Sequence, residues 1–195
     1  MNKGPLIIVS GPSGCGKSTL VRRVLAESGL PLRASVSATT RPRREGEIDG
    51  VSYHFWDADR FRSEVGAGAF LEWCEVHGRH YGTLRREVEA YRNRGLGVIL
   101  TIDVQGAAKV RQQCPDAFSI FVTTPSLEEL ERRLRSRGSE SEAAIALRLA
   151  NARQELARQD EYDCVLINDD LDRAVAELRD VLAGLFAKGE SCSTS

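Results

Sequence analysis

Eight consecutive residues near the start of the chain have the types and spacing of a phosphate-binding loop. Gly11-Pro12-Ser13-Gly14-Cys15-Gly16-Lys17-Ser18 matches G-x-x-x-x-G-K-[ST] in full, between an apolar run and a helical pattern. The glycines let backbone N–H groups turn inward around phosphate oxygens, and the following helix adds the partial positive charge of its N-terminus. We expect Lys17 to reach the β- and γ-phosphates and the Ser18 hydroxyl to bind Mg²⁺, whereas Cys15 fills a position without chemistry. The loop predicts nucleoside triphosphate binding; the alternative is a glycine-rich turn that binds no nucleotide.

A second group of chemically capable residues lies between positions 35 and 47. Three arginines, Arg41, Arg43 and Arg44, stand beside Glu45, Glu47 and several hydroxyl side chains. A nucleic-acid patch would repeat its basic residues without carboxylates, so this mixture suits one small anion with an attached polar group. A solvated loop that neutralises its own charges explains the same residues equally well.

Short apolar runs predict the elements that must position these groups. Residues 6–9, 98–102, 118–122 and 164–167 are β-branched or aromatic and short, and each adjoins a helical pattern. Residues 18–27 are predicted as a helix with one apolar face. This order predicts an α/β fold with a doubly wound parallel sheet.

Between residues 34 and 94 the pattern changes. An Asp49-Gly50 turn is followed by alternating apolar positions. We therefore predict a small antiparallel lobe with a hairpin at this turn, inserted into the parallel core.

A second excursion covers residues 128–150. Ser126-x-x-Glu129 and Ser139-x-x-Glu142 are capping boxes, each preceding an apolar helical stripe. Two capped helices meeting at residues 137–139 predict a moving lid. The polar residues 189–195 are expected to form a frayed tail.

The overall composition excludes several classes of protein. The 195 residues include 27 Lys+Arg and 28 Asp+Glu, which gives a net charge of −1, with 42% hydrophobic and 28% charged residues. These values exclude a disordered or fibrous chain and a protein that binds polyanions by bulk charge. No apolar run approaches the roughly 18 residues of a membrane span, so no membrane partner is expected. The five cysteines are scattered, which favours free thiols in a reducing cytoplasm.

Longer segments resemble one known family. They are, in chain order, residues 35–55, Phe70-Leu71-Glu72-Trp73, Tyr81-Gly82-Thr83, Ile102-Asp103-Val104-Gln105-Gly106 and Arg137-Gly138-Ser139. In order and spacing they resemble the guanylate kinases over nearly the whole chain. The resemblance implies a P-loop NTPase fold, a three-layer doubly wound parallel sheet with an inserted antiparallel GMP-binding lobe and a helical lid. It implies one domain over 1–188, with core 1–33, 95–127 and 151–188, lobe 34–94 and lid 128–150.

The resemblance also implies a GMP site in the lobe. Arg41 and Arg44 would clamp the GMP phosphate, because guanidinium forks suit it better than a lysine. Tyr53 and Tyr81 would donate hydroxyls to the same phosphate. The full set of GMP-binding residues implied is Ser37, Arg41, Arg44, Glu47, Tyr53, Glu72, Tyr81, Gly82, Thr83 and Thr101.

Glu72 carries the guanine specificity in this reading, with Ser37 and Thr83 beside it. Its carboxylate can accept hydrogen bonds from both N1–H and the 2-amino group of guanine. Adenine has an acceptor at N1 and no 2-amino group, so a buried Glu72 would be left unpaired by AMP. The alternative is an exposed acid on an antiparallel strand.

The ATP side follows the same resemblance. Binding of ATP is implied for residues 11–19, which include Pro12, Ser13 and Thr19, and for Asn168, which would contact adenine or would simply be a turn residue after a strand. Arg133, Arg137 and Arg148 would close over the transferred phosphoryl group as catalytic residues with Lys17, Arg41 and Arg44. The alternative for Arg133 is a surface ion pair with Glu129, and Arg132 and Arg135 are expected to pair with Glu128 and Glu131.

Asp103 is the candidate second metal residue. It follows an apolar strand and would hold Mg²⁺ through water, with Ser18 binding directly; a helix N-cap is the alternative. Thr101 departs from the acidic residue that many of the family carry, which puts guanine selectivity in doubt. Arg43 stands where the family often has proline, and Ser139 where it often has threonine, and both replacements are expected to be tolerated. His77 and His80 lack a third ligand and are expected at the surface.

Together these residues predict the reaction ATP + GMP = ADP + GDP, with Mg²⁺ and with dGMP as a further acceptor. The substrates are small molecules, no nucleic-acid or membrane partner is expected, and the protein is expected to be a cytoplasmic monomer or homodimer. Two alternatives stay open. One is a guanylate-kinase-like module that binds phosphopeptides, against which the intact Lys17 and Ser18 speak. The other is a kinase for a different phosphorylated small molecule, against which Glu72 speaks.

Overall fold

The computed structural model describes residues 3–76, 78–136 and 142–191 and divides the chain into two compact units. One comprises Met1–Leu6, Pro31–Leu100 and Gln105–Ala117, and the other Ile7–Leu30, Thr101–Val104 and Phe118–Ser195. These boundaries differ from the predicted core, lobe and lid, a division by nucleotide-binding role that stays a prediction.

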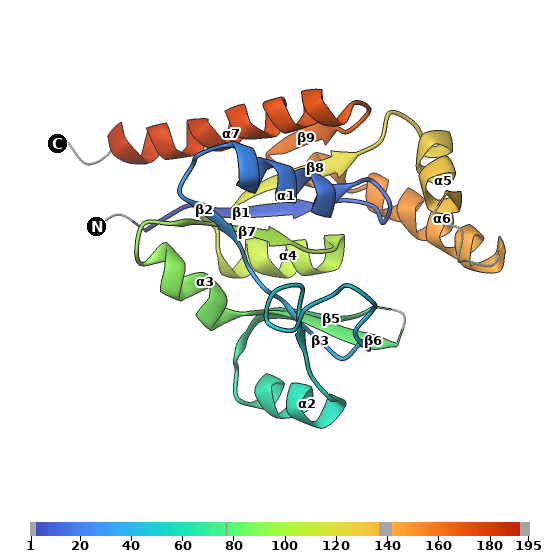
Figure 1. Cartoon of the computed structure of the whole chain (residues 1–195), viewed down its shortest axis with the longest axis horizontal. Coiled ribbons are helices and arrows are strands. Elements are labelled where there is room, and N and C mark those ends of the chain that lie inside the picture. The colour runs from blue at the N-terminus through green and yellow to red at the C-terminus, as the bar shows by residue number, and fades with distance from the viewer. Residues whose placement is uncertain (1–2, 77, 137–141, 192–195) are drawn as a thin grey trace. The chain divides into compact units, whose positions relative to one another are not determined.

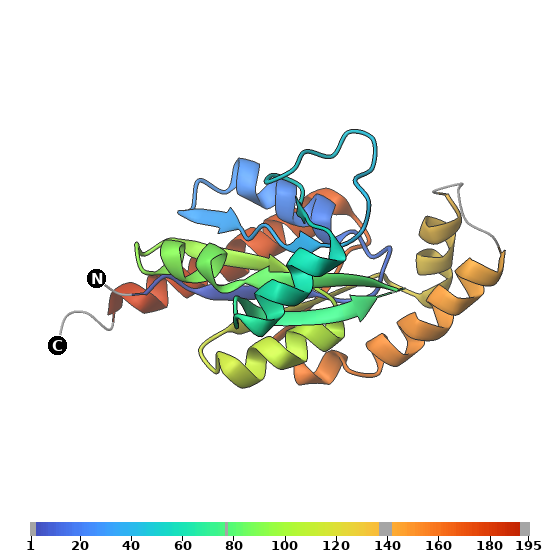
Figure 2. The same cartoon turned by 90° about the horizontal axis from the view of Figure 1, so that it is seen from below.

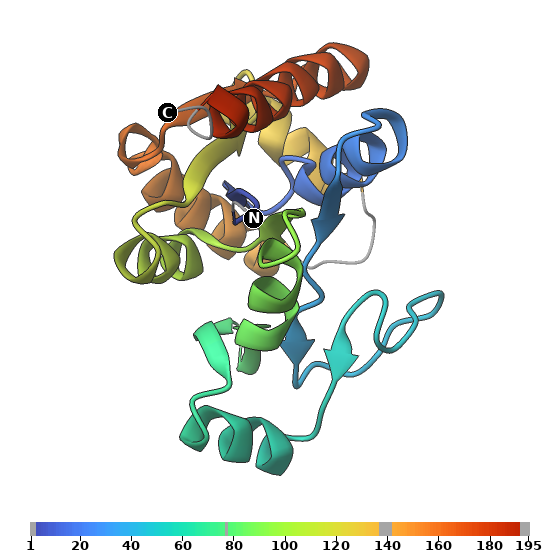
Figure 3. The same ribbon diagram turned by 90° about the vertical axis from the view of Figure 1, so that its left-hand side faces the viewer.

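The second unit is built on buried parallel strands. Its elements, all drawn in Figure 1, are β1 (Leu6–Ser10), α1 (Lys17–Glu27), β8 (Phe118–Thr123), α5 (Leu127–Arg135), α6 (Glu142–Leu156), the 3-10 turn η1 (Gln159–Glu161), β9 (Cys164–Ile167) and α7 (Leu171–Ser191). Every residue of β1 is buried, because a strand covered on both faces takes a continuous apolar run. Helices α1 and α7 lie side by side in Figures 1 and 3, and their apolar faces supply Leu20, Val24, Leu178 and Leu182 to the core.

The first unit contains a smaller sheet and three helices. Its elements are β2 (Leu32–Ala34), β3 (Ala38–Thr39), β4 (His54–Phe55), α2 (Ala58–Gly66), β5 (Phe70–Val76), β6 (Arg79–Leu84), α3 (Arg85–Arg92), β7 (Gly97–Thr101) and α4 (Val104–Gln113). An apolar cluster of Ala38, Trp56, Phe61, Phe70 and Leu84 lies beneath the small sheet. The stacked rings of Phe61 and Phe70, with centroids 4.5 Å apart, join helix α2 to β5.

The sheets confirm the predicted fold class. Within the described residues the larger sheet has the strand order β2-β7-β1-β8-β9, with β2–β7, β1–β8 and β8–β9 parallel. The smaller sheet has the order β4-β3-β6-β5, in which β3–β6 and β5–β6 are antiparallel. The strands predicted from apolar runs are all present, with ends shifted by at most one residue.

The predicted hairpin at Asp49-Gly50 is wrong. The turn exists, since Gly50 has φ 73° and its N–H donates to the Tyr53 carbonyl, but the strand that follows it, β4, runs parallel to β3. The hairpin of this unit joins β5 and β6 instead. In Figure 3 the segment between β3 and β4 extends as a long loop away from the small sheet. Alternation over three apolar positions did not distinguish this loop from a strand.

Gly11 has no room for a side chain. Its φ is 133°, and a Cβ would overlap the Val122 carbonyl oxygen of β8. We expect Gly11→Ala to cost about 2–4 kcal/mol of stability through backbone strain and displacement of β8. Gly184→Ala is the matched control, because Gly184 lies in α7 with nothing within 4 Å of a Cβ, and this change should gain up to about 1 kcal/mol. Urea unfolding measures the free energy of unfolding of both variants. Equal changes in Gly11→Ala and Gly184→Ala would contradict the claim that Gly11 has no room for a side chain.

Candidate active site

The phosphate loop forms a concave cradle between β1 and α1. The cavity has a volume of about 160 Å³ and is lined by Ser13, Gly14, Gly16, Lys17, Ser18 and Thr19. Gly11, Gly14 and Gly16 have φ of 133°, 94° and 96°, which few other residues adopt. The motif therefore has the glycine-dependent backbone conformation that the sequence predicts, and phosphate binding by it stays a prediction.

The Lys17 ammonium group lies over this loop. Its Nζ donates to the carbonyl oxygens of Gly11 and Pro12, at 2.7 and 2.8 Å, and lies 3.8 Å from Cys15 Sγ. Cys15 itself is fully buried. The cation is thus held at the mouth of the cradle, where a phosphate oxygen can exchange for the carbonyls.

The first helix of the predicted lid packs directly on the loop. A Cβ on Gly14 would lie 2.9 Å from Leu134 Cδ2 and 3.3 Å from Leu130 Cδ1, both in α5. The two leucines are 1% and 0% exposed. The Ser126 hydroxyl accepts a hydrogen bond from the Glu129 N–H, at 3.2 Å, so the predicted N-cap of this helix is confirmed. Figure 2 shows α5 and α6 together at one end of the unit that contains them.

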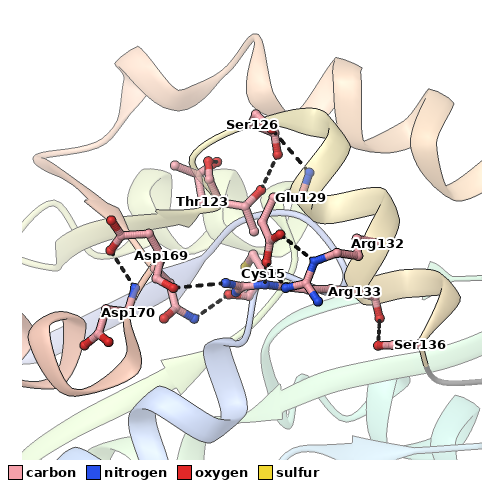
Figure 4. Close-up of polar contacts among 11 residues, drawn as sticks. Cys15, Thr123, Ser126, Glu129, Arg132, Arg133, Ser136, Asp169 and Asp170 are labelled. Atoms are coloured by element: carbon pink, nitrogen blue, oxygen red, sulfur yellow. Dashed lines mark hydrogen bonds and ion pairs between the residues drawn. The ribbon is translucent and has the colours of Figure 1, made fainter.

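Arg133 of α5 is held beside the loop that follows β9. Its Nε donates to Glu129 Oε1 at 2.7 Å, and its guanidinium reaches the Asp169 carbonyl at 3.5 Å, as Figure 4 shows. The Glu129 pair that was the alternative for Arg133 is therefore present. Glu129 also accepts from Arg132, whereas the sequence predicted Glu128 as that partner, which is wrong. Both arginines hold the pKa of the Glu129 carboxyl at about 2.

The remaining lid residues are placed only in part. Arg148 is half-buried in the second turn of α6, and Arg135 pairs with Glu131 at 2.8 Å as predicted. Arg137 and Ser139, which the sequence assigned to the junction of the two helices, lie outside the described residues. His77 does too, and His80 lies in β6 with 31% of its side chain exposed.

Asn168 lies at the end of β9 and is 5% exposed. Its Nδ2 donates to the Cys15 carbonyl oxygen at 2.8 Å, and its backbone N–H donates to the Thr123 carbonyl at 2.8 Å. It therefore contacts the phosphate loop.

The candidate metal residues are oxygen donors of the kind that Mg²⁺ prefers. Ser18 is exposed in the first turn of α1, and Asp103 is half-buried two residues after β7. Burial raises the pKa of the Glu155 carboxyl in α6, Lys17 opposes that rise and Asp103 adds to it. Lys17 and Asp103 therefore both lie close enough to the Glu155 carboxyl to affect its pKa.

In the other unit, Arg41 and Glu47 form a two-pronged ion pair. The guanidinium donates to Glu47 Oε1 at 2.6 Å and to Oε2 at 3.0 Å, and the backbone N–H of Arg44 donates to Glu47 Oε2 at 2.7 Å. Arg41 holds the pKa of the Glu47 carboxyl below its usual range. The Arg44 side chain is exposed. Glu47 thus binds both the side chain of Arg41 and the backbone of Arg44, and it holds the two arginines in the same turn of the loop.

Two tyrosines lie next to this pair. The rings of Tyr53 and Tyr81 meet edge to face, with centroids 6.1 Å apart, and the Arg41 guanidinium lies 5.5 Å from the Tyr53 ring centroid. Burial raises the pKa of the Tyr53 hydroxyl, which stays protonated and can donate at neutral pH. The four predicted groups, two arginines and two tyrosines, thus come from a loop and from β6.

Glu72 is buried on β5. It is 5% exposed, and its Oε1 accepts a hydrogen bond of 2.7 Å from Thr83 Oγ1 on β6, which is fully buried. The alternative of an exposed acid is excluded. Gly82 precedes Thr83 on β6 and pairs with Trp73 of β5, and a Cβ on Gly82 would be 2.5 Å from the Phe70 ring. Ser37, one residue before β3, is half-buried, and Thr101 ends β7 and is half-buried too.

The amino-acid sequence is similar to known proteins along nearly the whole chain. The sequence model of the family described as "Guanylate kinase" matches residues 3–185. The chain belongs to the guanylate kinase family. The guanylate kinase of Rubrobacter xylanophilus is 50% identical over 192 residues, which cover 98% of this chain and 100% of that protein. The guanylate kinase of Symbiobacterium thermophilum is 52% identical over 180 residues, which cover 92% and 85%.

A solved structure agrees with this membership. The crystal structure of guanylate kinase from Anaplasma phagocytophilum superposes with a TM-score of 0.77 at 30% identity and covers 94% of this chain and 87% of that one. In the part of the chain that the structure describes, no helix has the length and apolar character needed to cross a membrane.

Two features of this guanylate kinase family member were missed from the sequence. Glu155 lies near Lys17 and Asp103, and a single acid at one position of a long helix gives no signal for that. The packing of Leu130 and Leu134 on Gly14 was also missed, although their four-residue spacing did predict a buried stripe. Distant contacts of this kind depend on where the helix is docked.

Proposed function

We propose that this protein transfers the γ-phosphoryl group of ATP to GMP, giving ADP and GDP, and that dGMP also serves as acceptor. The observation that carries the proposal is the buried Glu72–Thr83 pair in a unit that also presents Arg41, Tyr53 and Tyr81. Besides the hydrogen bond from Thr83, this buried carboxylate can accept from the N1–H and the 2-amino group of guanine, which AMP lacks.

In the acceptor half of the site, Arg41 and Arg44 would bind the GMP phosphate. A phosphate dianion offers Arg41 a stronger partner than Glu47, with which its fork is engaged at 2.6 and 3.0 Å. Tyr53 and Tyr81 donate their hydroxyls, and Ser37, Glu72 and Thr83 read the base. These contacts orient one phosphate oxygen as the nucleophile.

In the donor half, the loop over residues 11–19 would bind the ATP phosphates through its backbone N–H groups. Lys17 exchanges its carbonyl partners for β- and γ-phosphate oxygens and stabilises the charge that develops on the transferred group. Ser18 would hold Mg²⁺ directly and Asp103 through water, and the ion when bound neutralises charge on the same phosphates. The chemistry needs no nucleophilic side chain from the protein.

The lid arginines Arg133, Arg137 and Arg148 would complete the cationic surround. For Arg133 this requires that a phosphoryl group compete with Glu129, as with the Arg41–Glu47 pair. Closure over the substrates excludes water, which would otherwise accept the phosphoryl group. We also propose a cytoplasmic location, which is supported by the small purine nucleotide substrates.

An acceptor panel tests the proposed reaction. ADP release is measured at saturating ATP with GMP, dGMP, AMP, UMP and CMP. The proposal expects release with GMP and dGMP and background rates with the others. Release only with another acceptor would contradict the substrate assignment. No transfer to any acceptor despite intact ATP binding would favour a binding module.

Arg44→Met tests the phosphate clamp. Only the backbone of Arg44 contacts Glu47, so the fold should stay intact, while loss of a phosphate contact should lower kcat/KM for GMP about 100-fold or more. Arg43→Met is the matched control, since Arg43 is its exposed neighbour and has no assigned role, and should behave as wild type. Steady-state kinetics and thermal unfolding measure both. Normal turnover of Arg44→Met would show that the clamp is misassigned.

A further inference from the structure

Asn168 connects the end of β9 to the phosphate loop through its side chain. Its backbone N–H is fixed by the Thr123 carbonyl of β8, and its Nδ2 donates to the Cys15 carbonyl oxygen, each at 2.8 Å. The side chain is 5% exposed, so neither end of the link exchanges freely with water. The residue thus lies between two fixed points, one in the sheet and one in the loop.

The Cys15 carbonyl needs such a partner because of what the loop does. A loop that turns its N–H groups inward toward phosphate turns carbonyl groups the other way, and a buried carbonyl without a donor costs free energy. Cys15 is fully buried, and Asn168 supplies the donor that its carbonyl requires. Without that bond, rotation of the peptide unit between Cys15 and Gly16 would lower the free energy, because it would give the carbonyl another partner. The same rotation would turn the Gly16 N–H away from the cradle.

The contact also fixes Gly16. This residue has φ 96°, and a Cβ there would overlap Asn168 Nδ2, so the amide fills the space where a side chain would otherwise lie. Gly16 precedes Lys17, and its carbonyl accepts the Leu20 N–H at 3.0 Å in the first turn of α1. The amide therefore packs against the residue at which the loop becomes a helix.

We propose that Asn168 is a positioning residue for the triphosphate, which holds the Cys15–Gly16 peptide in its phosphate-binding orientation independently of any contact with the base. The inference rests on the proposed function, in which this loop binds the phosphates of ATP. It is separate from the adenine contact that the family resemblance implies. An asparagine amide has two N–H groups and an acceptor oxygen, and the bond to Cys15 uses one of the N–H groups, so both roles fit one side chain.

Inorganic tripolyphosphate distinguishes the two roles, because it has no base. Its affinity for wild type, Asn168→Ala and Asn168→Asp is measured by titration calorimetry, together with that of ATP. Asn168→Ala leaves the carbonyl unpaired and should weaken tripolyphosphate binding about tenfold. Asn168→Asp keeps the shape of the side chain but places a carboxylate oxygen against the Cys15 carbonyl oxygen, so that two acceptors face each other. It should weaken tripolyphosphate binding about 100-fold. Asn93→Asp, the same change at an exposed position after α3, should bind as wild type.

Kinetics and stability provide the second readout. The two Asn168 variants should raise KM for ATP and leave KM for GMP unchanged, a split that general loss of structure does not produce. If Asn168→Ala fails to fold, the isosteric Asn168→Asp carries the test. Weakened ATP binding with wild-type affinity for tripolyphosphate would make Asn168 a base contact only and would overturn the inference. If wild type itself binds neither ATP nor tripolyphosphate, the proposed ATP site fails instead.

Discussion

Lys17→Met should lower kcat by about 1,000-fold and weaken ATP binding. The ammonium is the cation that the loop holds at its mouth, 2.7 and 2.8 Å from the Gly11 and Pro12 carbonyls, and loss of one preorganised charge at a transferring phosphoryl group costs about this much. Single-turnover measurements with saturating ATP and GMP separate the chemical step from binding.

Two control variants make this prediction specific. Lys3→Met removes an exposed lysine and should leave kcat unchanged. Lys17→Arg keeps the charge, but a planar guanidinium does not fit between two carbonyls that hold a compact ammonium, so it should be nearly as inactive as Lys17→Met. Full activity of Lys17→Met would mean that phosphoryl transfer occurs elsewhere.

Glu72→Gln should lower kcat/KM for GMP by about 1,000-fold while leaving KM for ATP unchanged. The new amide can still accept from Thr83 Oγ1, so the pair within the sheet survives, but its N–H groups face the N1–H and 2-amino donors of guanine. The same N–H can donate to N1 of adenine, so the ratio of AMP to GMP turnover should rise.

The matched control for this change lies on the same strand. Glu75 is exposed on β5, and Glu75→Gln should leave both acceptors unaffected. Acceptor competition between GMP and AMP gives the ratio directly. An unchanged preference for GMP in Glu72→Gln would show that the guanine is read by other groups, with Thr101 the first to examine, since the family resemblance expects an acid there.

Local signals in the sequence predicted most of the fold and much of the site. The phosphate loop was predicted in full, because its chemistry depends on backbone conformation that glycine spacing specifies. The burial of Glu72 on β5 agrees with the apolar residues Phe70 and Leu71 that precede it in the sequence, and both of these are buried too. Both inferences concern residues close together along the chain, where pattern and structure are directly linked.

The failures concern choices among nearly equal neighbours or contacts between distant segments. Arg132 has carboxylates three and four residues before it, and the pattern does not decide that Glu129 rather than Glu128 accepts its guanidinium. The bond from Asn168 to Cys15 joins residues 153 positions apart. No local sequence pattern predicts a contact over this separation. The sequence therefore predicted Asn168 either as a contact of the adenine base or as a turn residue.

The packing of Leu130 and Leu134 against Gly14 limits how the start of α5 can move relative to the phosphate loop. If α5 swung away from the phosphate loop, two leucines that are now shut off from water would be exposed, at about 3–6 kcal/mol for the pair. The start of α5 is therefore expected to stay packed on the phosphate loop, so Leu130 and Leu134 anchor the first part of the predicted lid.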